Sequence, residues 1–467
     1  MTNYMKSLNT TGQNRINPYS FMKRIFLLSL FALAATAMQA QNEYSFSLTQ
    51  AIDYALKNQS DVLNAQLDNT ISEYKVKEVV GMGLPQISAS FDIKDFFEIP
   101  TTLIPTSIVD TSAPEGQFYP VKFGTQWQAM GGLNASQIVF DPSYLLGVKA
   151  SKTYRELSQK SFTRTRIETA VAVTKAYYNL LVLQEAKPVI DANLVRVKKL
   201  RDDTKALFDN GFVEKIDLDR LEVTLNNVQS EKEKFDRNLE FSYSLLKFQM
   251  GMPVKSTLVI TDSLNTESIK NLAPATENFD VNKRVEYSLL KTQERFNMYN
   301  VKRYQQAGIP KLYLYGSFSY NGYANNFDIF DPEKKWYPTG IVGATLSFPI
   351  FDGMSRHARV VQSKSELAKI DNQIKQFENS ASMEIENSRN DMLNAVTALT
   401  LQEKNMQLAT DVARTSKIKY DQGVGSNLEI LDAETSLKEA QSNYYHAVYD
   451  ALIAKVNLDK AMGNLNY

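Results

Sequence analysis

The sequence predicts a mainly α-helical fold with a small β part, in which one helix–strand–strand–helix unit occurs twice. Three observations lead to this prediction: an internal repeat, four segments in which apolar and polar residues alternate, and two long stretches without a strong turn signal. A chain of 467 residues is long enough for two or three ordinary domains, so the repeat decides how it is divided.

The repeat has an offset of about 212 residues. The segment that begins at Gly211 resembles the segment that begins at Gly423 (423 minus 211 is 212). The same offset carries Gln229-Ser230 onto Gln441-Ser442 and Met250-Gly251 onto Met462-Gly463, and an offset of 211 carries Phe140-Asp141 onto Phe351-Asp352. Agreement over so many positions without a gap indicates a duplication.

The duplication divides the chain into four parts: residues 1–40 (an N-terminal extension and signal peptide), 41–251 (first repeat), 252–280 (an inter-repeat surface segment) and 281–467 (second repeat). Each repeat opens on a shorter helix, one from an N-cap at Ser47 to about Gly81 and one from about Val281 to Gly308. The predicted strands cover about 86–97, 125–140, 311–321 and 339–350, and the predicted long helices about 143–209, 214–250, 354–421 and 427–463.

An apolar run from Ile25 to Ala37 follows Lys23 and Arg24 and leads into small residues. A basic start, a short apolar stretch and a small-residue site are typical of a secretory signal, with Met22 as its natural first residue. We expect cleavage near Ala37 or Ala40. The run is too short to span a bilayer, and no other window is apolar enough to do so as a helix.

The predicted strands alternate with period two, as in Gln86–Lys94, where Ile87, Ala89, Phe91 and Ile93 share one face. Nine to eleven such residues fit a tilted transmembrane strand with a wet inner face, but also a soluble sheet with one buried face. The connections 95–125 and 321–338 are rich in aromatic residues. These residues fit either an interfacial girdle or a small loop core.

Two stretches of nearly seventy residues, about 143–209 and 354–421, lack a strong turn cluster. As continuous helices they would reach about 100 Å, and their apolar spacing of three and four predicts coiled-coil packing. Pro188 falls in the first stretch, where the second copy has Thr400. We expect a kink or a shift in packing there.

Composition excludes several functions. Lys plus Arg and Asp plus Glu number 52 each and the pI is about 6.8, so no basic excess indicates nucleic acid as a partner. The absence of cysteine excludes disulfides, thiolate sites and N-terminal lipoprotein acylation, and two histidines make imidazole sites improbable. Neither a phosphate loop nor an HExxH motif occurs. We therefore expect no enzyme activity, no cofactor, no metal site and no catalytic residues.

Four strands cannot close a barrel. If they lie in a membrane, the open edges of the sheet must pair with other copies, because unpaired backbone groups in lipid cost several kcal/mol each. A membrane interpretation therefore requires a homo-oligomer, without deciding between two, three and four copies.

The duplicated unit, the glycine-containing turns and the run from Gly423 to Glu434 resemble the TolC outer-membrane efflux family. The resemblance covers about Ser47 to Gly463. It implies a homotrimer in the outer membrane of a Gram-negative bacterium, with a 12-stranded barrel in the lipid and a long periplasmic α-helical coiled-coil tunnel. It further implies a passive exit duct for efflux or type I secretion, with a periplasmic adaptor (membrane-fusion) protein and an inner-membrane pump as partners. The cargo stays open. The alternative is a periplasm-spanning coiled-coil tether without channel activity.

The resemblance also assigns candidate site residues. Glu429 and Asp432 match the acidic positions that ring the periplasmic entrance, although acids near a helix N-terminus are also favoured by the helix dipole. Some family members have an arginine where this chain has Gly425, so the closed-state lock is expected to be weaker or differently built. The adaptor-docking tips would be Gly211, Phe212, Val213, Gly423, Val424, Gly425 and Ser426. The simpler reading is that these residues only form the turns.

Overall fold

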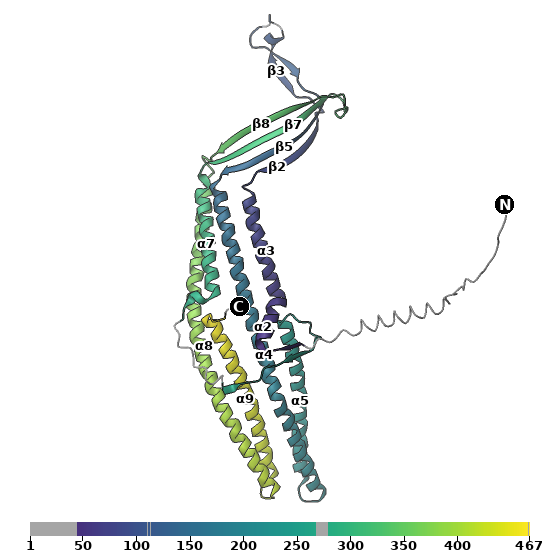
Figure 1. Cartoon of the computed structure of the whole chain (residues 1–467), viewed down its shortest axis with the longest axis vertical. Helices are drawn as coiled ribbons and strands as arrows, with labels where there is room; N and C mark the ends of the chain where they lie inside the picture. Colours follow the sequence, from purple (N-terminus) through teal and green to yellow (C-terminus); the bar gives the residue numbers. More distant parts are fainter. Residues whose placement is uncertain (1–43, 110, 113, 268–278, 466) are drawn as a thin grey trace, which may run out of the picture.

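The computed structural model describes residues 44–467 except 110, 113, 268–278 and 466. The predicted signal segment, with its cleavage site near Ala37 or Ala40, lies outside the described residues, as does part of the inter-repeat segment. The molecule is elongated, with a curved sheet at one end, a layer of helices below it, and two helix pairs at the other end (Figure 1).

The sheet contains strands from both repeats. Its order is β2 (Gln86–Asp95), β5 (Trp127–Phe140), β7 (Lys311–Ala324) and β8 (Trp336–Ser347), and all neighbours are antiparallel. The central pair β5–β7 joins the two repeats. Every residue of edge strand β2 is exposed within the chain, so this strand lacks the buried face that a soluble sheet would give it.

Below the sheet, four helices lie in the same order as the strands to which they are joined. α3 (Ser60–Gly81) leads into β2, α4 (Pro142–Asp209) follows β5, α7 (Val285–Gln305) leads into β7, and α8 (Ser355–Asp421) follows β8. α4 packs against α3 and α7, and α7 packs against α8. The strand layer and the helix layer therefore form one continuous wall.

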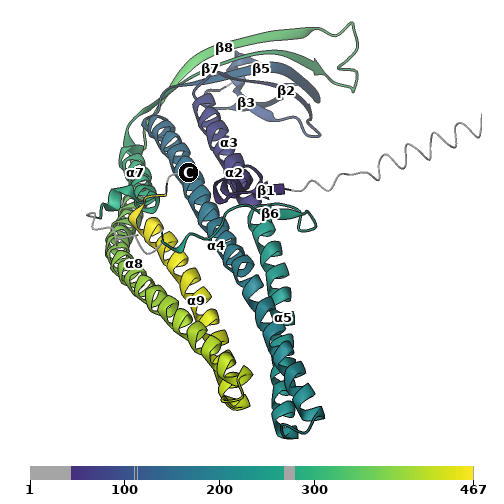
Figure 2. The same cartoon turned by 60° about the horizontal axis from the view of Figure 1, so that its bottom comes forward.

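At the far end, two antiparallel helix pairs extend away from the wall. α4 pairs with α5 (Lys215–Gln249) and α8 pairs with α9 (Asn427–Met462). Figure 2 shows that each pair ends in a tip of its own. α4 has 68 residues and α8 has 67, which corresponds to about 100 Å each.

A small belt packs on the middle of α4 and on the C-terminal end of α5. It consists of β1 (Tyr44–Phe46), α2 (Leu48–Asn58) and β6 (Leu258–Ile260), with β1 and β6 parallel. Tyr177 of α4 is fully buried there, and its hydroxyl donates to Asp262 at 2.9 Å and to the carbonyl of Phe46 at 3.1 Å. Burial, and next the Asp262 carboxylate, raise the pKa of Tyr177.

The first helix of repeat one is divided. Ser47 is its N-cap, in a capping box with Gln50, but the predicted single helix from Ser47 to Gly81 is two helices, α2 and α3. Gln59 separates them in an extended conformation (φ −70°, ψ 131°), and its side chain accepts from the amides of Asp61 and Val62. Glutamine is not a usual N-cap, so no residue pattern marks this break.

In repeat two, the short helical turns η2 (Val281–Lys283) and η3 (Gln306–Gly308) flank α7. Together, η2, α7 and η3 cover the range expected for the opening helix of the repeat.

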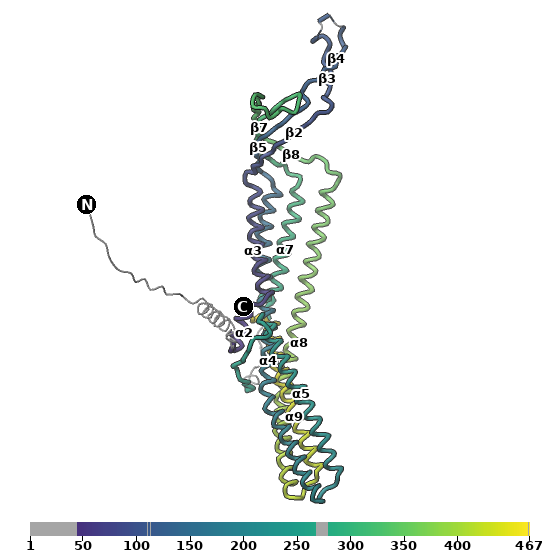
Figure 3. The backbone as a smooth tube through the Cα atoms, turned by 90° about the vertical axis from the view of Figure 1, so that its right-hand side faces the viewer, coloured from purple at the N-terminus to yellow at the C-terminus, as the bar shows by residue number. Residues whose placement is uncertain are grey.

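The connections beyond the sheet carry more structure than the sequence suggested. β3 (Thr101–Pro105) and β4 (Phe118–Lys122), with the turn η1 (Thr106–Ile108) between them, form a hairpin that projects past the sheet (Figures 1 and 3). In the second connection Ile329 is fully buried against Ala129 and Ala324. Neighbouring rings also contact one another: Phe91, Trp127, Phe327, Phe330 and Trp336. Of these described residues, only Ile329, Ala129 and Ala324 form a buried loop core, whereas Phe91, Phe327 and Phe330 keep more than half of their surface exposed.

Across the described ranges, none of the helices is both long and apolar enough to cross a bilayer.

Candidate functional site

The tips of the two helix pairs have the same backbone construction. In α4, the amide of Gly211 donates to the carbonyl of Phe208 and the amide of Phe212 to that of Leu207, both at 2.9 Å. In α8, Gly423 and Val424 repeat these bonds to Tyr420 and Lys419 at 3.0 Å. This is the Schellman motif, which needs a left-handed residue; Gly211 has φ 77° and Gly423 has φ 74°.

Each tip exposes two large apolar side chains to solvent. Phe212 and Val424 are 78% and 79% exposed, and Ile216 and Leu428, one turn into the return helices, are 51% and 60% exposed. Both pairs are separated by the repeat offset (424 minus 212, and 428 minus 216, are 212). Sequence reasoning found Phe212 and Val424 but missed Ile216 and Leu428, which the repeat offset could have revealed.

Gly425 is needed for packing. A Cβ atom at this position would lie 2.9 Å from the backbone nitrogen of Tyr420 and 3.1 Å from atoms of Lys419. The second tip therefore folds back onto the end of α8 more closely than any larger side chain allows. Ser426 follows as the N-cap of α9 and accepts from the amide of Glu429 at 3.1 Å.

The two candidate gate acids differ in their surroundings. Glu429 lies in the first turn of α9 and forms an ion pair with Lys419 of α8 at 3.0 Å, with both side chains about half exposed. Asp432 is exposed, and no ion pair or hydrogen bond of its carboxylate to another described residue is found. In the first repeat, Asp217 lies 3.8 Å from Arg220. Of the two candidate gate acids, Asp432 is therefore the one whose charge is not offset by an ion pair.

The two helix pairs contact each other just above the tips. The hydroxyl groups of Thr204 and Tyr420 share a hydrogen bond of 2.9 Å, and the Asn427 amide donates to the carbonyl of Asp217 at 3.2 Å. A small apolar core joins α4, α5 and α9 at the same level: Leu200, Leu221 and Ile430.

Polar bridges continue these contacts toward the belt. Arg196 of α4 pairs with Glu434 of α9 at 3.1 Å, where the Glu434 side chain is only 10% exposed. Lys438 pairs with Glu231 at 2.7 Å. Asn193 donates to Gln441 at 3.0 Å. A half-buried bridge resists screening by salt better than an exposed one, so the Arg196–Glu434 pair is the strongest of the three.

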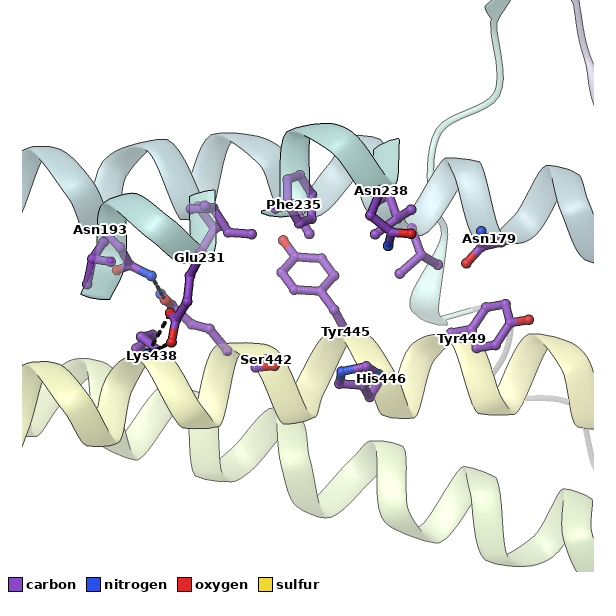
Figure 4. Close-up of a pocket in the computed structure, with 17 residues that line it drawn as sticks. Asn179, Asn193, Glu231, Phe235, Asn238, Lys438, Ser442, Tyr445, His446 and Tyr449 are labelled. Atoms are coloured by element: carbon purple, nitrogen blue, oxygen red, sulfur yellow. Dashed lines mark hydrogen bonds and ion pairs between the residues drawn. The ribbon is translucent and has the colours of Figure 1, made fainter. Parts of the chain in front are cut away.

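Above these bridges, a cavity of about 380 Å³ lies between α4, α5 and α9. Figure 4 shows Tyr445 reaching from α9 toward Phe235, beside the Glu231–Lys438 pair. The apolar lining of the cavity comes mainly from Val182, Leu183, Ala186, Val189, Ile190 and Val228. At this level, an unfilled cavity lies between the two helix pairs, next to the places where they are in direct contact.

Pro188 lies inside α4 next to this cavity, and the helix continues through it to Asp209. Because proline has no amide hydrogen, the carbonyl of Gln184 lacks its helical donor. The next carbonyl, that of Glu185, accepts from the hydroxyl of Tyr445 at 3.1 Å. At the matched position of repeat two, the Thr400 hydroxyl donates within its own helix, to Val396 at 2.9 Å. The turn around Pro188 is therefore contacted by the other repeat.

Comparison with known proteins agrees with this architecture. Residues 292–464 match the model of the outer membrane efflux protein family. The outer membrane protein TolC of Vibrio cholerae is 19% identical over 340 residues, which cover 72% of this chain and 76% of that protein. The solved structure of CusC has a TM-score of 0.72 at 15% identity, covering 89% of this chain and 92% of CusC. The CmeC outer membrane channel of Campylobacter jejuni has a TM-score of 0.71 at 18% identity, covering 89% and 85%.

The fold is thus the one found in solved outer-membrane channels of this kind. The family match over residues 292–464, in the second repeat, and the TolC relatives confirm the resemblance to the TolC-like outer membrane efflux family.

Proposed function

We propose that three copies of this chain form the passive exit duct of a tripartite efflux or type I secretion system in the outer membrane. The observation that carries this proposal is the shared order of strands and helices, β2-β5-β7-β8 above α3-α4-α7-α8. When a wall built in this way closes on copies of itself, the strands form a barrel and the helices form a tube on the same axis.

Closure is favoured by the exposed apolar surface and open edges of the sheet. Ile87, Phe91 and Val342 are 72%, 56% and 91% exposed, although they belong to the edge strands β2 and β8. Pairing β8 of one copy with β2 of the next would satisfy both edges, as lipid requires. Three copies would give the twelve strands that the family resemblance implies.

At the other end, the tips are proposed to dock the periplasmic adaptor, which in turn binds an inner-membrane pump. The apolar side chains Phe212, Ile216, Val424 and Leu428 support this proposal because exposed apolar groups repeated at matched positions suit binding of another protein. Gly211 and Gly423 to Ser426 supply the turns that present them, with Val213 beside them. Glu429 and Asp432 are proposed to form the acidic ring of the entrance.

Conductance distinguishes the duct from a tether. Purified protein, reconstituted into planar bilayers, should give discrete trimer-sized conductance steps, whereas a coiled-coil tether gives none. Absence of conductance from protein that has inserted would overturn the duct proposal.

Adaptor docking is tested by removing the apolar tip groups. The double variant F212S/V424S should weaken binding to the adaptor about tenfold or more, because two large apolar contacts are lost, and should leave conductance unchanged. The matched control is V195S/F241S, two exposed apolar residues on α4 and α5 away from the tips (66% and 63% exposed). Equal binding by both variants would argue against docking at the tips. Gly425 is a poor probe, since its substitution deforms the turn itself.

A further inference from the structure

An apolar rim surrounds the junction between strands and helices. Large side chains at this level are exposed in each of the four wall segments. They are Met82 and Leu84, Leu145, Ile309, and Ile350, Phe351 and Met354, with exposed fractions from 39% to 88%. Apolar groups left in contact with water at one level of a wall are typical of a surface that another apolar phase covers.

A basic collar follows directly below this rim. We define the collar as residues 75–80 of α3, 147–155 of α4, 299–305 of α7 and 355–361 of α8. These four segments hold nine lysines and arginines against one acid: Lys75, Lys77, Lys149, Lys152, Arg155, Lys302, Arg303, Arg356 and Arg359 against Glu78. In a chain with 52 residues of each sign, this is a marked local excess of positive charge.

A hollow of about 330 Å³ lies between α4 and α7 at the level of the collar and extends to Glu156 and Gln159 just below it. Three cations line it, Lys149, Lys152 and Arg155, and none of them forms an ion pair with a described residue. The acid in its lining, Glu156, is already bound by Lys160 at 2.9 Å and Arg295 at 2.5 Å. The hydrogen bond from Lys160 is the main cause that holds the pKa of Glu156 below its usual value. The hollow is therefore positively charged.

We propose that this hollow binds the phosphate group of an anionic phospholipid in the periplasmic leaflet of the outer membrane. The proposal rests on the proposed function, because it places the strands in the lipid. Lys149 lies four residues after Leu145, so both side chains share one face of α4 about 6 Å apart along the helix. That distance matches the depth of a headgroup layer, about 5–7 Å per leaflet, and lysine can extend its ammonium group upward to reach it.

The position of the hollow in the wall favours a lipid as the occupant. α4 and α7 are the two inner helices of the wall, while α3 and α8 lie at its edges. A neighbouring copy that joins at β2 and β8 would therefore leave the hollow uncovered. A phospholipid carries both a phosphate group, which the cations attract, and acyl chains, which would cover the apolar rim. Free phosphate would contact the cations alone.

The test compares lipid retention by two matched variants. The full-length protein is exchanged into mixed micelles with equal phosphatidylglycerol and phosphatidylcholine, and the lipids that remain bound are measured by mass spectrometry. K149Q/K152Q/R155Q should lower phosphatidylglycerol enrichment about tenfold or more, since each of the three cations is attracted to an anionic lipid headgroup. The control K198Q/K199Q/K205Q removes three exposed cations of the same helix near its tip and should stay within about twofold of the wild type.

Two outcomes would overturn the inference. The first is equal enrichment in both variants and the wild type. The second is displacement of phosphatidylglycerol by millimolar inorganic phosphate, which would assign the hollow to the free anion. Conductance of the wild type is measured in parallel: a protein that conducts without lipid preference contradicts only the lipid site, whereas an inserted protein without conductance contradicts the duct.

Discussion

At the scale of single residues, Asp141 and Asp352 show how the two repeats have diverged. They are matched by the repeat, and each accepts a backbone amide at the start of a long helix. Asp141 is buried, and its carboxylate also binds the Tyr313 hydroxyl at 3.0 Å and Lys311 at 3.1 Å. Asp352 is exposed. One position therefore joins the sheet to the helices, while the other only caps a helix.

The charge of Asp141 predicts a pH dependence of stability. Burial alone would raise its pKa, but the hydrogen bonds from Lys311, Ser143 and Tyr313 outweigh burial, so the pKa is lowered. A lowered folded-state pKa stabilises the fold above the unfolded value of about 4, and this contribution is lost as the pH falls through the lowered value.

In detergent at pH 7, D141N should therefore have a free energy of unfolding about 1–2 kcal/mol lower than that of the wild type. In acid, the stabilities of the two proteins should converge. D352N, on the exposed partner position, should change little. A difference between D141N and the wild type that persists unchanged at pH 2 would contradict this account.

The ion pair between Lys419 and Glu429 predicts that the gate acids are unequal. Because Lys419 already offsets Glu429, D432N should reduce cation selectivity in bilayer conductance more than E429Q does. K419Q should raise selectivity, since it leaves Glu429 unpaired. The changes are expected to be modest, about twofold, since exposed charges are screened by salt. Unchanged selectivity in E429Q/D432N would remove the acidic-ring assignment.

At the scale of elements, the long helices, the alternating strands and the tip turns are the parts that sequence reasoning could locate. Their signals are local: a period of two, apolar spacing of three and four, and Gly211 and Gly423 at left-handed positions. The break at Gln59, the β3–β4 hairpin and the Lys419–Glu429 pair depend on contacts between distant segments. Neither propensity nor spacing carries that information, so they became visible only in three dimensions.

The turn around Pro188 gives an element-scale prediction. Y445F removes the hydroxyl that donates to the Glu185 carbonyl, and a hydrogen bond of this kind contributes about 1 kcal/mol. Amides of α4 just after Pro188 should therefore exchange about fivefold faster with deuterium. Y449F, one turn along α9 and also in the cavity lining, serves as the control. Equal exchange in both variants would show that the bond does not hold this turn.

At the scale of the whole molecule, the sheet edges predict the oligomer. The natural chain contains no cysteine, so one cysteine introduced into β2 and one into β8 report only on contacts between these edges. Oxidation or a short bifunctional reagent should give covalent species that end at three copies in denaturing gels, with the best pair giving the register. A strictly monomeric protein in the membrane would contradict the trimer.

The separation of β2 and β8 at opposite edges of one sheet also has a kinetic consequence. A single copy cannot complete its own hydrogen-bonded ring, so no monomer can reach the lipid-stable state by itself. Under the proposed trimer, insertion and assembly become a single event whose rate rises steeply with the concentration of periplasmic precursor. Dilution should then arrest biogenesis before insertion, and the stalled copies, with open edges and apolar faces, would be the natural clients of periplasmic chaperones.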